Sequence, residues 1–359
     1  LQPRADVARS EADHRGAADI GGDRHIVREL DSGAGEQGFA EAIGGVYIEL
    51  GSIKLGIELG RFARGSEDID KTAGDRLAIE LGYPAEFVRA IVADLGADAG
   101  RAALLAMNTR APIALRVNTL KATVDVAAAE LKSEGIQTRH GTQAKNALVL
   151  TTRANLYGLM AFKGGLIEAQ DEGSQLVAAL VEAKPDESIL DACAGAGGKT
   201  LALAAAMENR GRLVAVDTSR ERLAECERRA TRAGASIVKT ARVHPSASWL
   251  ESRIPADFDA ALVDAPCTGS GTLRRNPEMR WHLTGDWLTR FPAQQRAILD
   301  EAARHVRAGG RLVYATCSLL RRENEDVALS FVADSHGAWA LGHTERIPPV
   351  AGGSDGFFA

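Results

Sequence analysis

The sequence predicts an α/β fold in which a doubly wound parallel sheet follows a smaller α+β module. From about residue 160 onward, short continuous apolar stretches alternate with segments of helical periodicity, which is typical of a parallel sheet covered on both faces. Before that point the elements are shorter and less regular. With 359 residues the chain is long enough for two domains. We therefore expect an uncertain segment at 1–66, the module at 67–158 and the larger domain at 159–359.

The first half of the chain contains short predicted elements that are mainly helical up to residue 108. Residues 1–66 are rich in Gly and Asp with weak periodicity, so we expect short helices at most. Residues 72–108 carry apolar residues at helical spacing, broken by Gly-Tyr-Pro and Gly-Ala-Asp, which predicts three short helices. A strand at 113–120, a helix at 124–135 and a strand at 147–152 then complete the module.

The second half gives a regular series of alternating elements. The predicted strands are 188–195, 212–217, 258–266 and 310–318, and the predicted helices are 198–208, 219–234 and 294–306. Ligands of such sheets bind outside the carboxyl ends of the strands. The residues at those ends are Cys193, Asp217, Asp264 and Cys317.

The composition narrows the class of protein. The chain is 45% hydrophobic and 25% charged, and no apolar run approaches the roughly 20 residues that cross a bilayer, so we expect a cytoplasmic protein with no membrane partner. The four cysteines form no C-x-x-C pair, which predicts free thiols and no metal.

The net charge of -5 gives no general attraction to a polyanion. A nucleic-acid partner would therefore need local basic clusters, each of which could equally be a solvated face. The candidate clusters are Arg274, Arg275 and Arg280; Arg321 and Arg322; and Arg228, Arg229 and Arg232.

A glycine-rich turn in "ILDACAGAGGKT" marks a cofactor site. Gly195, Gly197 and Gly198 stand between a strand and a helix, where the backbone can approach a ligand. Their spacing fits neither the phosphate loop nor G-x-G-x-x-G. Asp217 ends the next strand, where a carboxylate can accept the hydroxyl hydrogens of a ribose. We therefore predict an adenosine-like ligand, with S-adenosylmethionine favoured over NAD.

The segment "DAPCTGSGTLRRNP" places Asp264 and Cys267 in a loop poor in side chains that suits a planar base, and Cys317 leaves the neighbouring predicted strand. A free cysteine alone is usually a buried filler. Two thiols, an acid and a methyl donor are what methylation of a pyrimidine at carbon 5 requires, because a thiolate must first add to carbon 6. The pattern does not choose which cysteine adds.

The sequence resembles the Sun (RsmB-like) family of RNA cytosine carbon-5 methyltransferases. The resemblance runs from about residue 75 to the end, through stretches such as "LRVNTLK", "EAQDEGSQLVA", "DACAGAGGKT", "DAPCTGSGTLRRNPEMRW", "ATCSLLRRENEDV" and "DGFF". It implies a Rossmann-like S-adenosylmethionine-dependent methyltransferase domain after an RNA-recognition module.

The same resemblance assigns roles to single residues. It implies that Cys317 is the nucleophile, that Cys267 assists product release, and that Asp264 lies near the reacting centre with Lys199 buttressing it. The implied S-adenosylmethionine ligands are Cys193, Ala194, Gly195, Ala196, Gly197, Gly198, Lys199, Asp217 and Asp264.

Two departures from the family pattern stand out. Members usually carry an acid after the third strand that holds the adenine amino group, and this chain has Val243, His244 and Pro245 there. Bacterial ribosomal members often have a helical RNA-binding domain ahead of the module, and we expect residues 1–66 to be too short and too rich in Gly for that domain to be intact.

We expect a monomer that makes 5-methylcytosine in ribosomal RNA. Transfer RNA is the alternative substrate, and a non-catalytic RNA-binding or ribosome assembly factor is the alternative class. Arg274, Arg275 and Arg280 are expected near the phosphates of an extruded base, with Trp281 either stacking nearby or in the core.

Overall fold

The computed structural model describes residues 47–50, 53–56, 71–244, 249 and 254–359. The chain divides into two compact units, residues 1–67 and 68–359. In the first unit β1 (Tyr47–Leu50) pairs with β2 (Ile53–Gly56) in antiparallel fashion. The short helices expected within 1–66 are therefore wrong for these residues, whose backbone is extended. The rest of that expectation lies outside the described residues.

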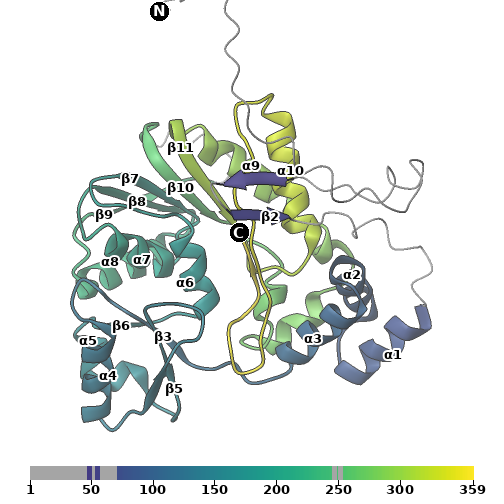
Figure 1. Ribbon diagram of the computed structural model, residues 1–359, viewed down its shortest axis with the longest axis horizontal. Helices are drawn as coiled ribbons and strands as arrows, with labels where there is room; N and C mark the ends of the chain where they lie inside the picture. Colours follow the sequence, from purple (N-terminus) through teal and green to yellow (C-terminus); the bar gives the residue numbers. More distant parts are fainter. Residues whose placement is uncertain (1–46, 51–52, 57–70, 245–248, 250–253) are drawn as a thin grey trace, which may run out of the picture. The chain divides into compact units, whose positions relative to one another are not determined.

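The second unit is built on a five-stranded parallel sheet of order β11-β10-β7-β8-β9 (Figure 1). Its strands are β7 (Ser188–Ala192), β8 (Arg212–Asp217), β9 (Val238–Arg242), β10 (Phe258–Asp264) and β11 (Val306–Ala315). The chain starts in the middle of the sheet, winds outward to β9 and then returns to the other side of β7 through β10. This reversal confirms the predicted doubly wound, Rossmann-like fold and places a crevice between β7 and β10.

Helices cover both faces of the sheet (Figure 1). One layer contains α6 (Glu172–Ala179), α7 (Gly198–Ala206) and α8 (Arg220–Ala233), and the other contains α9 (Phe291–Ala303) and α10 (Glu325–Asp334). Because successive strand residues face opposite sides, Ile189 packs in the first layer and Leu190 in the second. Helix α8 is bounded by Ser219, whose hydroxyl accepts from the Arg222 amide, and by Gly234 at a φ of 76°.

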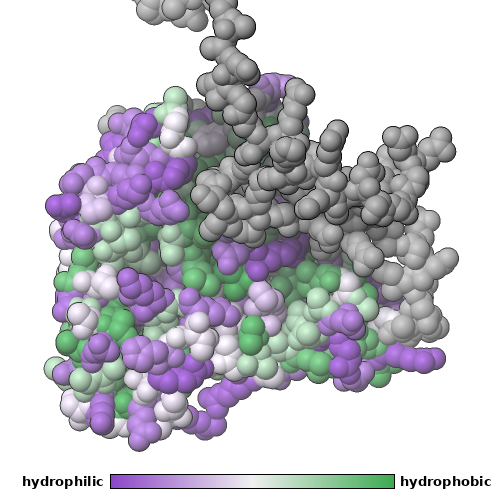
Figure 2. Space-filling model, in the orientation of Figure 1, coloured by the Kyte–Doolittle hydropathy of each residue, from purple (hydrophilic) through white to green (hydrophobic). Residues whose placement is uncertain are grey.

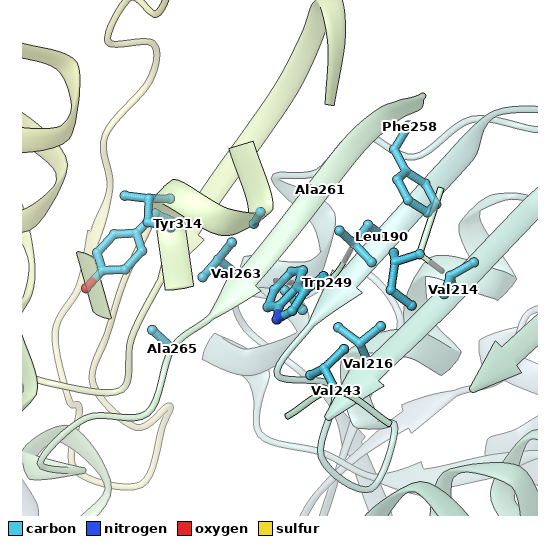
Figure 3. Packing of buried hydrophobic residues seen from close by; sticks show 14 of the residues in the cluster. Leu190, Val214, Val216, Val243, Trp249, Phe258, Ala261, Val263, Ala265 and Tyr314 are labelled. Carbon is cyan, nitrogen blue, oxygen red and sulfur yellow. The ribbon is translucent and has the colours of Figure 1, made fainter. Parts of the chain in front are cut away.

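The core between the sheet and the helices α9 and α10 extends along the strands, from Phe258 at the start of β10 to Ala265 just after its end (Figure 3). Leu190, Val214, Val216 and Val263 form a buried apolar surface, and the ring of Trp249 lies across it. Burial of such side chains contributes about 1.5–3 kcal/mol each. The floor of the crevice is therefore a rigid, closely packed layer.

The smaller module has a four-stranded antiparallel sheet of order β4-β5-β3-β6. Its elements are β3 (Ala114–Val117), α4 (Val124–Ser133), β4 (Thr138–His140), β5 (Ala147–Leu150), the 3-10 helix η2 (Leu156–Gly158), α5 (Met160–Lys163) and β6 (Ile167–Ala169). Strand β6 comes after residue 158, where the sequence places the end of the module. The sheet therefore takes an edge strand from the segment that leads into α6.

The three helices expected within 72–108 are present as α1 (Lys71–Leu81), α2 (Ala85–Leu95) and α3 (Ala97–Met107). Their buried residues cluster with leucines from loops that follow β10 and β11: Leu273, Leu283, Leu288, Leu319 and Leu320. These helices thus support the loops of the larger domain.

Short elements complete the second unit. They are the 3-10 helices η3 (Ser270–Thr272), η4 (Pro277–His282), η5 (Gly285–Leu288) and η6 (Arg321–Glu323), and the antiparallel pair β12 (Arg346–Ile347) and β13 (Phe357–Phe358). Phe358 also bridges to Thr316, directly after β11. Figure 2 shows polar and apolar residues interspersed over the face drawn. In the part of the chain that the structure describes, every helix is too short or too polar to span a bilayer.

Candidate active site

A cavity of about 960 Å³ lies at the carboxyl ends of the parallel strands. The strand-end residues expected to carry function all line it, together with residues of the adjoining loops. They are Cys193, Ala194, Gly195, Ala196, Asp217, Asp264, Cys267 and Cys317. Val243, His244 and Trp249 line the same cavity, and α9 supplies part of its wall.

The glycine-rich turn after β7 forms one wall of the cavity. Cys193 and Gly195 have positive φ values of 61° and 57°, which reverse the chain within a few residues. A Cβ on Gly195 would have no other protein atom within 4 Å, whereas a Cβ on Gly197 would lie 2.5 Å from the Sγ of Cys226 in α8. Gly195 therefore leaves its side open, and Gly197 allows α7 and α8 to pack closely.

Asp217 holds this turn to the end of β8. Its Oδ2 accepts a hydrogen bond of 2.9 Å from the Gly195 amide, and its Oδ1 accepts one of 2.8 Å from the Ser219 amide. Each carboxylate oxygen has a further lone pair that can accept from a ligand hydroxyl. The aspartate thus shapes the turn and faces the cavity.

An ion pair joins the turn to the end of β10. Lys199 Nζ, in the first turn of α7, donates to Asp264 Oδ2 at 2.7 Å. Burial alone would lower the pKa of Lys199, but the Asp264 carboxylate raises it above its ordinary value. Burial raises the pKa of the neighbouring Asp191 to about 7, and its Oδ1 has no hydrogen-bond partner among the residues that the structure describes.

The two cysteines of neighbouring strands meet in the cavity. Cys267 Sγ and Cys317 Sγ are 3.4 Å apart, which is a hydrogen-bond distance between thiols. The hydrogen bond from Cys267 lowers the pKa of Cys317, helped by the nearby Lys199 ammonium, while the same contact and burial raise the pKa of Cys267. Cys317 is therefore the more acidic of the two. Burial raises the pKa of the third lining thiol, Cys193.

A buried hydroxyl network fixes the loops that carry the two cysteines. The hydroxyls of Thr268, Ser270 and Ser318 lie 3.2 Å from one another. Glu323 Oε2 accepts from the Thr268 amide at 2.9 Å, and Ser270 Oγ accepts from the Leu319 amide at 2.8 Å. Since these groups are shielded from water, losing one partner leaves an unpaired polar group.

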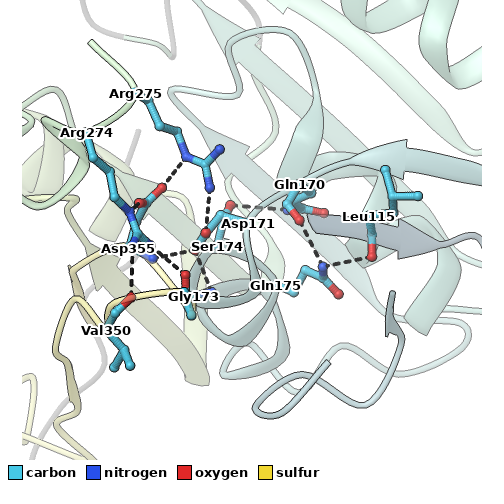
Figure 4. Close-up of polar contacts among 12 residues, drawn as sticks. Leu115, Gln170, Asp171, Gly173, Ser174, Gln175, Arg274, Arg275, Val350 and Asp355 are labelled. Atoms are coloured by element: carbon cyan, nitrogen blue, oxygen red, sulfur yellow. Dashed lines mark hydrogen bonds and ion pairs between the residues drawn. The ribbon is translucent and has the colours of Figure 1, made fainter. Parts of the chain in front are cut away.

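Residues near Asp355 hold the loop that follows Cys267 through contacts with two arginines (Figure 4). Arg274 is an ion-pair partner of Asp355 and donates to the carbonyls of Val350 and Gly353. Arg275 pairs with Asp355 and with Asp171, the N-cap of α6. The loop after Cys267 is thus tied to the "DGFF" segment and to the residues that follow β6.

Two family models match this chain. The model described as 16S rRNA methyltransferase RsmB/F matches residues 178–356, and the model described as Methyltr_RsmF/B-like, ferredoxin-like domain, matches residues 83–157. The probable ribosomal RNA small subunit methyltransferase B of Bacillus subtilis (strain 168) is 32% identical over 312 residues, which cover 86% of this chain and 67% of the relative. The chain belongs to the RsmB/F family.

Further relatives agree with this membership. Ribosomal RNA small subunit methyltransferase B of Pseudomonas syringae pv. tomato is 32% identical over 270 residues, covering 70% of this chain and 59% of the relative. The crystal structure of a methyltransferase homolog protein from Pyrococcus horikoshii has a TM-score of 0.66 and 28% identity, covering 80% of this chain and 97% of that one. The family resemblance predicted from the motifs is confirmed, and the predicted α+β module is matched by the ferredoxin-like domain of this family.

S-adenosylmethionine is the cofactor of this family of RNA methyltransferases. The residues present fit it: the open side of Gly195 gives space along the turn, Asp217 offers carboxylate oxygens, and the cavity extends to the thiols. After β9, Val243 is buried and His244 lines the cavity in place of the usual acid, while Pro245 lies outside the described residues.

The predicted cofactor residues divide into two groups. Cys193, Ala194, Gly195, Ala196, Asp217 and Asp264 line the cavity. The other three are not among the lining residues of the cavity. Gly197 permits close packing of α7 and α8, Gly198 begins α7, and Lys199 donates a hydrogen bond to Asp264.

The expectation that Arg274 meets RNA phosphates is wrong. Its side chain is 0% exposed because Asp355 and two carbonyls enclose it. Arg275 and Arg280 are also held by protein groups, Arg280 by the Gly82 carbonyl and Asn108. Trp281 is 66% exposed, so it is not a core residue.

Several groups that shape the site were missed from the sequence. Glu323, Thr268 and Ser318 carry the hydroxyl network, and Asp355 anchors Arg274. The contacts join residues about 50 to 80 positions apart. Glu323 and Asp355 do not directly follow a predicted strand, and the sequence beside Thr268 and Ser318 does not show which distant residues they contact.

Proposed function

We propose that this chain methylates carbon 5 of a cytosine in ribosomal RNA through a covalent adduct between Cys317 and the base. The observation that carries the proposal is the pair of thiols 3.4 Å apart in the cavity that the glycine-rich turn also lines. One thiol with a lowered pKa beside one with a raised pKa supplies a nucleophile and a proton donor in the same place.

The adduct forms when the Cys317 thiolate adds to carbon 6. The new carbon–sulfur bond uses the thiolate electron pair, and the electrons of the carbon 5–carbon 6 double bond move toward ring nitrogen 3, which takes up a proton. That proton comes from solvent, and the Asp264 carboxylate, which lines the cavity and is held by Lys199 at 2.7 Å, accepts a hydrogen bond from the protonated nitrogen. Carbon 5 becomes an enamine carbon, nucleophilic enough to take a methyl group.

S-adenosylmethionine supplies that methyl group as an electrophile on its sulfonium. The remaining step removes the carbon 5 proton, re-forms the double bond and expels the Cys317 thiolate. Once Cys317 is bonded to carbon it is no longer an anion, so the cause that most raises the pKa of Cys267 is gone. Cys267 can then release its own proton to solvent, take the carbon 5 proton, and donate its hydrogen bond to the departing thiolate.

Two variants test this assignment. The protein is incubated with labelled S-adenosylmethionine and ribosomal RNA, and then analysed by denaturing electrophoresis and by mapping of methylated cytosines. Cys267→Ala should accumulate a covalent protein–RNA complex, because the adduct forms but is not released. Cys317→Ala should form none.

The outcomes separate the alternatives. Trapping by Cys317→Ala and not by Cys267→Ala would reverse the two roles. Methylation of transfer RNA in preference to ribosomal RNA would change the substrate, and folded protein that binds RNA but incorporates no label would be an assembly factor.

A further inference from the structure

The buried carboxylate of Glu168 joins the four-stranded module to the methyltransferase domain. Glu168 lies on β6, and its side chain is 2% exposed. Its Oε2 accepts from Arg229 Nε at 3.2 Å and Nη2 at 3.0 Å, and its Oε1 accepts from Arg232 Nη2. Both arginines belong to α8, so one carboxylate of the module contacts two residues of this helix.

Arg229 also contacts the glycine-rich turn, so it links Glu168 to that turn. Its Nη1 donates to the Ala196 carbonyl at 2.7 Å, and Ala196 lines the cavity. The other side of the same peptide group is held as well, because the Gly197 amide donates to the Ala194 carbonyl at 2.9 Å. The peptide plane between Ala196 and Gly197 is thus fixed at its carbonyl by Arg229 and at its amide by the turn itself.

This external support matters because the turn has few side chains of its own to restrain it. Glycine backbone visits more conformations than any other residue. A planar guanidinium with several donors in fixed directions can hold a carboxylate and a carbonyl at the same time. Arg229 therefore sets the position of the turn relative to β6.

Further contacts fix the end of α8 against the module. Asn118 Nδ2 donates to the Ala233 carbonyl at 2.8 Å, and Lys121 Nζ donates to the Arg232 carbonyl at 2.7 Å. The helix cannot slide along the module without breaking these bonds. The link from Glu168 through Arg229 to Ala196 is consequently a rigid one.

We propose that Arg229 is a positioning residue for the S-adenosylmethionine-binding turn and that Glu168 of the module acts through it. The module thereby contributes to cofactor affinity without touching the cofactor. The inference rests on the proposed function only for the ligand of the cavity. A fastening role between domains, by contrast, would change stability and leave cofactor affinity unaltered.

The test measures binding of S-adenosylhomocysteine by calorimetry to the full chain and to Arg229→Lys, Glu168→Gln and the double variant. Each single variant should weaken binding about tenfold, since one charge-assisted support of the turn is lost. The double variant should be no weaker than the single ones, because both act on one link. Arg228→Lys is the matched control: it lies next to Arg229 on α8, is 68% exposed and pairs only with Glu225 among the described residues.

RNA affinity and thermal unfolding are measured on the same proteins. RNA affinity should change less than about twofold in every variant, because neither Glu168 nor Arg229 lines the cavity in which the base would react. Unchanged S-adenosylhomocysteine affinity in folded Arg229→Lys would overturn the inference, and so would an equal loss in Arg228→Lys. A wild-type protein that binds S-adenosylhomocysteine but methylates no RNA would instead refute the proposed function and leave this inference standing.

Discussion

The glycine-rich turn and the two cysteine loops border one cavity but are held by different kinds of contact. The turn is fixed mainly through its main chain, by the Gly195 amide on Asp217 and the Gly197 amide on the Ala194 carbonyl. The cysteine loops are fixed by buried side chains, chiefly Thr268, Ser318 and Glu323. The turn should therefore be sensitive to an added Cβ, and the loops to loss of a polar group.

The largest effect that we expect is a loss of methylation caused by a change in the cysteine loops that leaves the glycine-rich turn intact. Cys317→Ala removes the proposed nucleophile and should lower methylation by more than about a thousandfold, as deletion of a covalent nucleophile does elsewhere. S-adenosylhomocysteine affinity should stay within about twofold of wild type, since the turn keeps its contacts. Methylation assays and calorimetry on the same sample make the comparison. Retained methylation would place the nucleophile elsewhere.

Truncating Glu323 should damage the cysteine loops. Glu323→Ala leaves the Thr268 amide unpaired in the interior and creates a cavity, so we expect a loss of about 3 kcal/mol in the free energy of unfolding. Urea unfolding measures this loss. A variant as stable as wild type would show that the hydroxyl network does not hold the loops. Glu225→Ala, on the exposed face of α8, is a control that should cost little.

The turn offers a matched pair of glycines. Gly197→Ala combines a positive φ with a Cβ 2.5 Å from Cys226 Sγ, and should cost about 2 kcal/mol of stability. Gly195→Ala has a positive φ but open space, and should cost about 1 kcal/mol. Its methyl group would point into ligand space, so its S-adenosylhomocysteine affinity should fall more than its stability. Equal destabilisation by both would contradict this division of roles.

The smallest effect expected is a shift in the pH dependence of the thiols. Because the hydrogen bond from Cys267 lowers the pKa of Cys317, Cys267→Ala should raise it. The thiolate form of Cys317 would then require a higher pH. The rate of alkylation of Cys317 by iodoacetamide, followed against pH by mass spectrometry, should show a half-point above that of wild type. A half-point that stays or falls would mean that Cys267 does not stabilise the anion.

The same contrast explains what the sequence could predict. The central strands and the residues at their carboxyl ends were found because their pattern is local: a continuous apolar strand followed by Gly, Asp or Cys. The three-residue strand β6 was missed, since Glu168 has the local pattern of a surface residue but is buried in ion pairs with Arg229 and Arg232. The apolar pattern alone did not reveal strand β9, because its "VKTAR" sequence is partly polar at the edge of the sheet; only the family resemblance implied a third strand before Val243.

In the site, too, the residues at strand ends were predictable and their distant partners were not. Strand-end logic brought Cys193, Asp217, Asp264 and Cys317 to one cavity. It could not find Glu323, nor see that Arg274 is an internal anchor, because a basic residue in a loop has the same local pattern whether it faces RNA or a buried carboxylate. Only the distant Asp355 decides between these two environments.

The anchoring of the cysteine loops also has a consequence for protein synthesis. Gly271 exchanges hydrogen bonds with Cys317 and Gly356, and Arg274 depends on Asp355, so residues 267–275 reach their final positions only after residue 356 has been made. Chains fold progressively from the N-terminus during translation. The glycine-rich turn can therefore form on a growing chain well before the thiols are brought together. A growing chain that has not yet reached residue 356 therefore has the glycine-rich turn without the assembled thiol pair.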